Sequence, residues 1–145
     1  MLKILIIGLP GSGKTTLAKN LSKDLNAKWI NADNIRKRYN DWDFSKEGIL
    51  RQAKRMRDLS NKPTKKKIVI CDFICPFEEG RKLFNPDVLI WMNTVKEGRF
   101  KKNSIDHFFQ KPKKYDFMTK RKNAEIFSKK IIKKLNNSFL KMELG

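Results

Sequence analysis

Hydrophobic residues along this chain gather in short unbroken runs that alternate with longer segments of spaced apolar positions. The first run, Ile4–Ile7, contains only large aliphatic residues and is followed at once by a glycine. Such runs are typical of parallel strands, because both faces of a parallel sheet are buried. On this pattern we expect strands at Lys3–Ile7, Lys28–Ala32, Ile68–Cys71, Val88–Met92 and Tyr115–Thr119.

Helices are predicted between these strands from apolar residues that recur at every third or fourth position. Leu17, Leu21 and Leu25 form one such row. We expect Asp33 to open the second helix as its N-cap, and Ser45 to cap the third. The expected helices are Thr15–Leu25, a helix from Asp33 onward, Phe44–Ser60, Pro76–Phe84 and Asn123–Leu140.

The alternation of strands and helices predicts an α/β fold, with a five-stranded parallel sheet covered by helices on both faces. A chain of 145 residues has an ordinary length for one domain, so we expect a single domain over residues 1–145. Within it, residues 94–114 are basic and irregular, with scattered aromatic residues. We interpret this segment as a closing lid, with a solvated surface loop as the alternative.

The segment Gly8-Leu9-Pro10-Gly11-Ser12-Gly13-Lys14-Thr15 fits the phosphate-binding pattern G-x-x-x-x-G-K-S/T in full, after a strand and before a helix. Its glycines let backbone N–H groups turn inward, and the helix N-terminus favours an anion. Lys14 is expected to act as a catalytic charge on the β- and γ-phosphates of ATP, and the Thr15 hydroxyl to ligate Mg²⁺. The predicted nucleotide contacts are Gly8, Gly11, Ser12, Gly13, Lys14, Thr15 and Thr16.

Two carboxylates stand where predicted strands end, and ligands of open α/β sheets bind outside the carboxyl ends of strands. Asp72 is therefore a candidate Mg²⁺ partner, with a plain polar strand end as the alternative. Asp33 is a candidate catalytic residue that accepts the proton of a substrate hydroxyl, while Arg36 clamps an anionic substrate. A helix N-cap is the other interpretation of Asp33, and the two roles are compatible.

Composition bounds the partners and the compartment. The net charge of +19 suits nucleic acid or small polyanions. Lysines outnumber arginines and are spread along the chain, so a solvated basic surface is the alternative.

No apolar stretch approaches the roughly 20 residues of a membrane span, and no secretory signal is present, so we expect no membrane partner and a cytoplasmic protein. Cys71 and Cys75 lack the spacing of a zinc site and are expected to be buried thiols, and His107 a surface residue.

Three segments resemble the adenylylsulfate kinase family: Asn31-Ala32-Asp33-Asn34-Ile35-Arg36, Asp43-Phe44-Ser45 and Phe73-Ile74-Cys75-Pro76-Phe77. The similarity runs from Met1 to about Asp116. It implies a P-loop kinase fold that transfers the γ-phosphate of ATP to the 3′-hydroxyl of adenosine 5′-phosphosulfate. A small nucleotide is the substrate that this resemblance implies, and we expect a monomer or a homodimer.

The resemblance also implies roles for residues around the acceptor substrate. Asp33 matches the family's catalytic base, and Arg36 matches a substrate-binding arginine. Phe44 matches an aromatic residue that stacks on the substrate adenine. Phe73 and Ile74 belong to a segment that lines the substrate pocket.

A further similarity lies in the lid-like segment. Gly98-Arg99-Phe100-Lys101-Lys102 is similar to a stretch of the family's mobile lid. Arg99 or Lys101 would neutralise charge during the transfer. Phe108 matches the family's second stacking aromatic.

Five positions depart from the family's pattern: Asn31, Ile49, Gln52, Cys75 and Glu97. Ile49 stands where a second substrate arginine is expected. The loss of one bidentate arginine costs about 1.5–3 kcal/mol, which is enough to change the preferred substrate. A nucleoside, nucleotide or polynucleotide end kinase is therefore the alternative function. A binding module that uses the nucleotide without catalysis is a further one.

Overall fold

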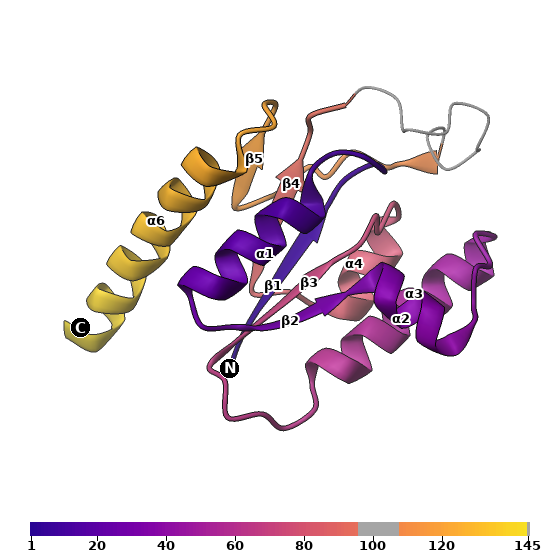
Figure 1. The fold of residues 1–145 in the computed structure, drawn as a ribbon, viewed down its shortest axis with the longest axis horizontal. Coiled ribbons are helices and arrows are strands. Elements are labelled where there is room, and N and C mark those ends of the chain that lie inside the picture. The colour runs from indigo at the N-terminus through magenta and orange to yellow at the C-terminus, as the bar shows by residue number, and fades with distance from the viewer. Residues whose placement is uncertain (96–107, 145) are drawn as a thin grey trace.

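The computed structural model of the protein describes residues 1–95 and 108–144 (Figure 1). Its centre is a sheet of five parallel strands in the order β2-β3-β1-β4-β5. The strands are β1 Leu2–Ile7, β2 Lys28–Asn31, β3 Ile68–Asp72, β4 Val88–Met92 and β5 Phe117–Thr119. The predicted five-stranded parallel sheet is confirmed, although the last strand begins two residues later than the pattern indicated.

Helices follow the strands in the described part of the chain. They are α1 Lys14–Asp24, α2 Ala32–Tyr39, α3 Lys46–Ser60, α4 Glu78–Phe84 and α6 Ala124–Leu144. The predicted cap of α3 is confirmed, because the Ser45 hydroxyl accepts a hydrogen bond from the Gly48 backbone N–H at 3.2 Å. None of the described helices combines the length and the apolar character needed to cross a bilayer.

The start of α2 corrects the expectation that Asp33 is its N-cap. The cap is Asn31, whose backbone is extended and whose side-chain oxygen accepts a hydrogen bond from the Asn34 N–H at 3.1 Å. An Asn at the end of the strand offers this acceptor two residues before Asp33. Asp33 therefore lies inside the first turn of the helix, where its carboxylate is favoured by the positive end of the helix dipole.

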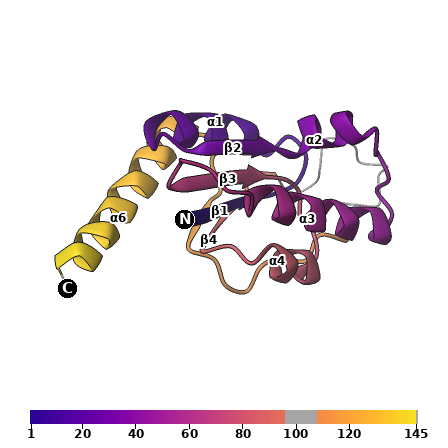
Figure 2. The same cartoon turned by 90° about the horizontal axis from the view of Figure 1, so that it is seen from below.

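Helices cover both faces of the sheet, as predicted (Figure 2). Ile4 and Ile6 of β1 share one buried cluster with residues of α1 and α6. Leu5 and Ile7, which alternate with them, belong to a second cluster with residues of α2, α3 and α4. Successive side chains of a strand point to opposite faces, so a strand covered on both sides must be apolar throughout. This requirement explains the unbroken aliphatic run at the start of the chain.

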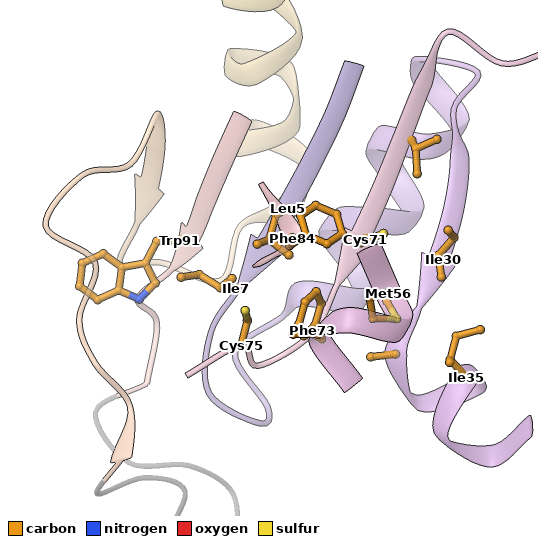
Figure 3. Packing of buried hydrophobic residues seen from close by; sticks show 13 residues of the cluster. Leu5, Ile7, Ile30, Ile35, Met56, Cys71, Phe73, Cys75, Phe84 and Trp91 are labelled. Atoms are coloured by element: carbon orange, nitrogen blue, oxygen red, sulfur yellow. The ribbon is translucent and has the colours of Figure 1, made fainter. Parts of the chain in front are cut away.

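The second cluster fixes α3 and α4 against the sheet beneath the cavity described below (Figure 3). Phe84 of α4 packs edge-to-face on Phe73, with ring centroids 5.9 Å apart, and Met56 of α3 is fully buried. Cys71 and Cys75 lie in the same cluster as free, buried thiols, as expected. Burial raises the pKa of the Cys75 thiol to about 12, so both cysteines serve as small apolar groups.

The α2–α3 loop, residues 40–45, is held by charged side chains of α3. The Asp41 carboxylate accepts hydrogen bonds from Arg51 Nε at 2.9 Å and from Arg55 Nη2 at 3.0 Å. These two arginines hold the pKa of the Asp41 carboxyl well below its usual range. Arg51 Nη2 also donates to the Asp43 carboxylate at 3.1 Å. The loop is thus fastened to the helix at two points.

Gly48, in the first turn of α3, lies in close contact with Asp43 of this loop. A Cβ atom there would lie 2.2 Å from the Asp43 carbonyl oxygen and 2.5 Å from Asp43 Cγ. We predict that Gly48→Ala lowers the free energy of unfolding by about 1–3 kcal/mol, because the loop must move away from the helix. Urea denaturation of the purified variant measures this difference.

Gly80→Ala is the matched control for this prediction. Gly80 also lies in a helix, but its added Cβ would meet the Cys75 sulfur at 3.4 Å, which is an ordinary contact. Replacement of a helical glycine by alanine stabilises a helix by roughly 0.5–1 kcal/mol. Equal free energies of unfolding for the two variants would contradict the account of the α2–α3 loop.

Candidate nucleotide and acceptor site

The phosphate-binding loop, Gly8–Thr15, connects β1 to α1 and has glycines where a side chain would not fit. A Cβ at Gly8 would lie 2.6 Å from the Ser12 hydroxyl oxygen and 2.8 Å from a carbonyl oxygen of β4. Gly11 and Gly13 have φ angles of 82° and 96°, in the left-handed region that glycine adopts without strain. Gly13 is also the N-cap of α1, so the loop leads directly into the positive end of a helix.

Several features of this loop fit the phosphates of ATP. The first turn of α1 contains no acidic residue, and its backbone N–H groups form a natural anion site. The Ser12 hydroxyl is buried and finds no hydrogen-bond partner within the described part of the chain. Lys14 Nζ donates a hydrogen bond to the Leu9 carbonyl at 3.0 Å, which places its charge over the loop. These features fit an anionic phosphate group at this loop.

Asp72, at the end of β3, joins the phosphate-binding loop to strand β2. Its Oδ2 accepts hydrogen bonds from the Thr15 hydroxyl at 3.2 Å and from Asn31 Nδ2 at 3.0 Å. Its Oδ1 accepts a hydrogen bond from the Trp29 indole N–H at 2.7 Å. Asn31 and Asp72 are direct partners in the register of the parallel strands β2 and β3. Both carboxylate oxygens are therefore held in fixed directions.

Burial raises the pKa of the Asp72 carboxyl to about 6, although hydrogen bonds from Trp29 and Thr15 and the charge of Lys14 oppose the rise. A carboxylate that is 2% exposed is costly to ionise, and a nearby cation would remove that cost. Mg²⁺ is commonly held by one or two side-chain oxygens, together with phosphate oxygens and water. Thr15 and Asp72 supply oxygen donors of this kind and fit such an ion.

A cavity of about 800 Å³ opens beside the loop, at the carboxyl ends of β1, β2 and β3. The predicted site residues that line it are Gly11, Gly13, Lys14, Thr15, Thr16, Asp33, Arg36, Phe44, Asp72, Phe73 and Ile74. Asp33 reaches it from the first turn of α2 with an exposed side chain. The parallel sheet thus brings the phosphate-binding loop and the predicted acceptor residues into one hollow.

Arg36 and Phe44 contact each other on the wall of this cavity. Arg36 is only 5% exposed, and its Nη1 donates to the carbonyl oxygens of Asp41 at 2.8 Å and Asp43 at 3.4 Å. Its guanidinium lies 4.3 Å from the centre of the Phe44 ring, which is a cation–π distance. Phe44 is 41% exposed, so it is a wall residue and not part of the core.

Residues Phe73–Pro76 also line the cavity, and Arg81 of α4 holds this segment in place. Arg81 is buried and donates from Nε to the Cys75 carbonyl at 3.0 Å and from Nη2 to the Gln110 carbonyl at 2.6 Å. Phe108 lies close to this segment, with its ring 6.5 Å from that of Phe77. Phe108 does not line the cavity, in contrast to Phe44.

The structure adds roles that the sequence patterns did not assign. Trp29 and Asn31 bind the Asp72 carboxylate, Arg81 fixes the pocket segment, and Trp42 lines the cavity. Trp29 and Asn31 act on a partner 43 and 41 residues away in sequence, so no local motif marks this role. The predicted lid residues Arg99 and Lys101 lie outside the described residues, as does His107.

The strand order, the phosphate-binding loop after β1 and the carboxylate at the end of the neighbouring strand β3 define a P-loop kinase. The sequence model of the adenylylsulphate kinase family matches residues 1–89, which is more than half of the chain. The chain belongs to this family. Among curated protein sequences, none matches it.

Solved structures of kinases share the fold. An APS kinase of Mycobacterium tuberculosis in complex with AMPPNP and APS has a TM-score of 0.79 at 20% identity, over 93% of this chain and 97% of that one. A shikimate kinase of Acinetobacter baumannii in complex with shikimate has a TM-score of 0.67 at 16% identity, over 95% and 94%. A gluconokinase of Sinorhizobium meliloti 1021 has a TM-score of 0.61 at 12% identity, over 94% and 97%. At these identities the likeness establishes the fold.

The hydrogen bond from Trp29 to Asp72 orients the carboxylate that is expected to bind Mg²⁺. Loss of a group that orients a metal-binding carboxylate typically weakens metal affinity by 10- to 100-fold. We predict that Trp29→Phe raises the Mg²⁺ concentration needed for half-maximal ATP binding about 10-fold. Calorimetric titration of ATP at a series of Mg²⁺ concentrations measures this value.

Trp91→Phe is the control, because Trp91 belongs to the second core cluster and packs on Tyr115. This variant also loses an indole, and it should change stability without changing the Mg²⁺ dependence. The same Mg²⁺ requirement in Trp29→Phe and in the unaltered protein would show that the indole does not orient Asp72.

Proposed function

We propose that the protein transfers the γ-phosphate of ATP to a hydroxyl group of a nucleotide-like acceptor, with adenosine 5′-phosphosulfate as the leading candidate. The observation that carries this proposal is the shared cavity, in which the phosphate-binding loop lies beside Asp33 and Arg36. The family relationship supports the same reaction class. An APS kinase solved with APS shares the fold, which supports the choice of acceptor.

The chain's own residues divide the reaction between them. Lys14 and the N–H groups at the start of α1 bind the β- and γ-phosphates and stabilise the charge that develops in the transition state. Thr15 and Asp72 would hold Mg²⁺, which would neutralise phosphate oxygens. Asp33 accepts the proton of the acceptor hydroxyl as the oxygen bonds to the γ-phosphorus and the bond to ADP breaks. Arg36 binds an anionic group of the acceptor.

A nucleoside, a nucleotide or a polynucleotide end is the second candidate acceptor, and Ile49 favours it. Ile49 lines the cavity at the position where a second substrate arginine would be expected. Arg51, the nearest alternative, does not line the cavity and is paired with Asp41 and Asp43. Lys14 and Arg36 are the cationic residues of the described cavity wall. Of these acceptors, an uncharged nucleoside, with less negative charge than adenosine phosphosulfate, suits such a wall best.

Transfer from labelled ATP to a panel of acceptors tests the proposal. The panel contains adenosine 5′-phosphosulfate, AMP, adenosine and an oligonucleotide with a free 5′-hydroxyl. We expect adenosine phosphosulfate to be phosphorylated on its 3′-hydroxyl with the highest kcat/KM. A higher value for another acceptor would establish the second candidate, and no transfer to any of them would refute the proposed activity.

Asp33→Asn should lower the rate of transfer by about two to four orders of magnitude, the usual contribution of a general base. ATP affinity should stay within a few-fold, because Asp33 does not belong to the phosphate-binding loop. Single-turnover kinetics with labelled ATP, together with calorimetric ATP binding, separate the two effects. Asp58→Asn is the matched control, since Asp58 is exposed on α3 and outside the cavity.

Lys14→Ala is the positive control in the same assay and should abolish transfer in a folded protein. If Asp33→Asn instead abolishes ATP binding and leaves the rate per bound ATP unchanged, Asp33 acts on the nucleotide or its metal. That outcome would remove Asp33 from the role of base.

A further inference from the structure

A second cavity of about 530 Å³ lies at the edge of the sheet, between β5 and α6, which are neighbours in Figure 1. Its lining consists of residues 116–118 around β5 and of one side of α6 from Phe127 to Asn137, and we call it the β5–α6 groove. It shares no lining residue with the nucleotide cavity. The groove therefore lies outside the site proposed for phosphoryl transfer.

Three lysines of α6 line one side of this groove. Lys130, Lys133 and Lys134 follow the three- and four-residue spacing that brings side chains together on one side of a helix. All three are exposed, and none forms an ion pair with a residue in the described ranges 1–95 and 108–144. Lys129, by contrast, pairs with Glu125 at 3.5 Å. The lysine side of the groove therefore carries positive charge that is available to an anionic ligand.

Aromatic side chains line the groove beside these charges. Phe117 of β5 and Phe127 of α6 are half-buried, and both pack against the buried cluster that α6 shares with α1. Lys134 Nζ lies 5.9 Å from the centre of the Phe117 ring, so a cation and an aromatic ring are within reach of one ligand unit. Asp116, which also lines the groove, accepts a hydrogen bond from the Leu89 N–H at 2.8 Å. Its carboxylate is thus already engaged with β4.

We propose that the β5–α6 groove binds single-stranded nucleic acid, with the lysines on backbone phosphates and the phenylalanine rings against the bases. Proteins that bind single strands without sequence preference combine a positively charged groove with aromatic side chains in this way. The net charge of +19 favours a polyanion over a small anion, because each phosphate that is neutralised releases counterions from the nucleic acid. The nucleotide cavity accounts for little of that charge, since Lys14 and Arg36 are the cationic residues of its described wall.

The orientation of α6 favours a nucleic-acid strand over a membrane surface. A basic helix that binds a bilayer turns its apolar side outward, so that this side enters the headgroup region. In α6 the apolar residues next to the lysines in sequence, Ile131 and Leu135, are buried against the protein. A single strand can enter the groove and reach the half-buried rings, whereas a flat bilayer would meet only the lysines.

Fluorescence anisotropy of an internally labelled single strand of about 10 nucleotides tests the inference, since this length lies within the usual site size of such proteins. Both ends of the oligonucleotide carry phosphate, so neither end can act as an acceptor. The protein is saturated with Mg²⁺ and a non-hydrolysable ATP analogue, which fills the phosphate-binding loop. We expect a Kd of about 1–100 µM at about 0.15 M salt, the usual range for binding without sequence preference. A Kd above about 1 mM would overturn the inference.

Replacement of Lys130, Lys133 and Lys134 together by Gln should weaken oligonucleotide binding about 10-fold or more, because three phosphate contacts are lost. It should also lower the salt dependence. On a single strand, log K falls with log salt by about 0.7 for each phosphate neutralised, so the slope should become shallower by about 2. Titrations at a series of salt concentrations measure both quantities.

The matched control replaces Lys62, Lys65 and Lys67 by Gln. This variant removes the same charge from an exposed lysine-rich loop that does not line the groove. It should keep the Kd within about 3-fold and leave the salt slope almost unchanged. Equal losses in the two variants would show that binding follows the overall charge, and would overturn the assignment to the groove.

Inorganic polyphosphate, which lacks bases, separates recognition of a nucleic acid from attraction to any polyanion. Phe117→Leu should weaken oligonucleotide binding about 10-fold, within the range that stacking of a base on an aromatic side chain contributes. The same variant should leave polyphosphate binding unchanged, whereas the three-lysine variant should weaken both ligands. Phe127→Leu should act in the same direction as Phe117→Leu and provides the test if Phe117→Leu does not fold. If the variant weakens both ligands equally, or neither, the inference is overturned.

Vesicles that contain anionic phospholipid test the competing partner. Tighter binding of the protein to these vesicles than to the oligonucleotide, lost in the three-lysine variant, would assign the lysines to a membrane surface and overturn the inference. The three-lysine variant should retain phosphoryl transfer to a nucleoside or nucleotide, because its residues lie outside the nucleotide cavity. Loss of that transfer in a folded variant would show that the groove is not separate from the nucleotide site.

Discussion

The buried carboxylate of Asp72 is the interaction on which the rest of the site depends. It lies where three parallel strands end together, and it binds Thr15 of the phosphate-binding loop and both Trp29 and Asn31 of β2. Desolvation makes this carboxylate costly to keep charged, since burial raises its pKa to about 6. The hydrogen bonds and a bound cation offset that cost. A single acidic side chain thus ties the position of a predicted metal site to the register of the sheet.

The acceptor side of the cavity depends on a loop that arginine side chains hold in place. Its wall belongs to the α2–α3 loop, which ion pairs fasten to α3 and which Arg36 fastens to α2. Three arginines near this wall hold the loop in place. Arg51 and Arg55 bind the Asp41 carboxylate, and Arg36 binds backbone carbonyl oxygens. The cavity therefore presents aromatic and aliphatic surface where the family's pattern leads one to expect a second arginine. An aliphatic side chain, Ile49, thus lines the cavity where a charged one would be expected, and this difference affects which acceptor the protein prefers.

Local patterns in the sequence were sufficient to predict the five strands and the parallel sheet. Unbroken aliphatic runs identified the strands because a doubly covered sheet tolerates no other composition, and the glycine-rich motif located the phosphate-binding loop. The sequence reading fell short where two residues competed for one cap and where the partner of a side chain is distant in sequence. Asn31 caps α2 in place of Asp33 through a local bond from the Asn34 N–H, while its Nδ2 donates to Asp72. The contribution of Trp29 depends on strand order, which no short motif encodes. Trp42 stands on a loop held by Arg51, ten residues from Asp41.

The loop at the start of α1 is proposed to bind the β- and γ-phosphates, and not merely the nucleoside of a nucleotide. Calorimetric titration of the unaltered protein with ATP and with AMP, each with Mg²⁺, tests this role of the loop. Hydrogen bonds to charged groups contribute about 1.5–3 kcal/mol each, so the loss of two or more of them weakens binding by roughly 100-fold or more. We expect one ATP bound per chain and AMP binding weaker by at least that factor. Equal affinities for ATP and AMP would contradict it.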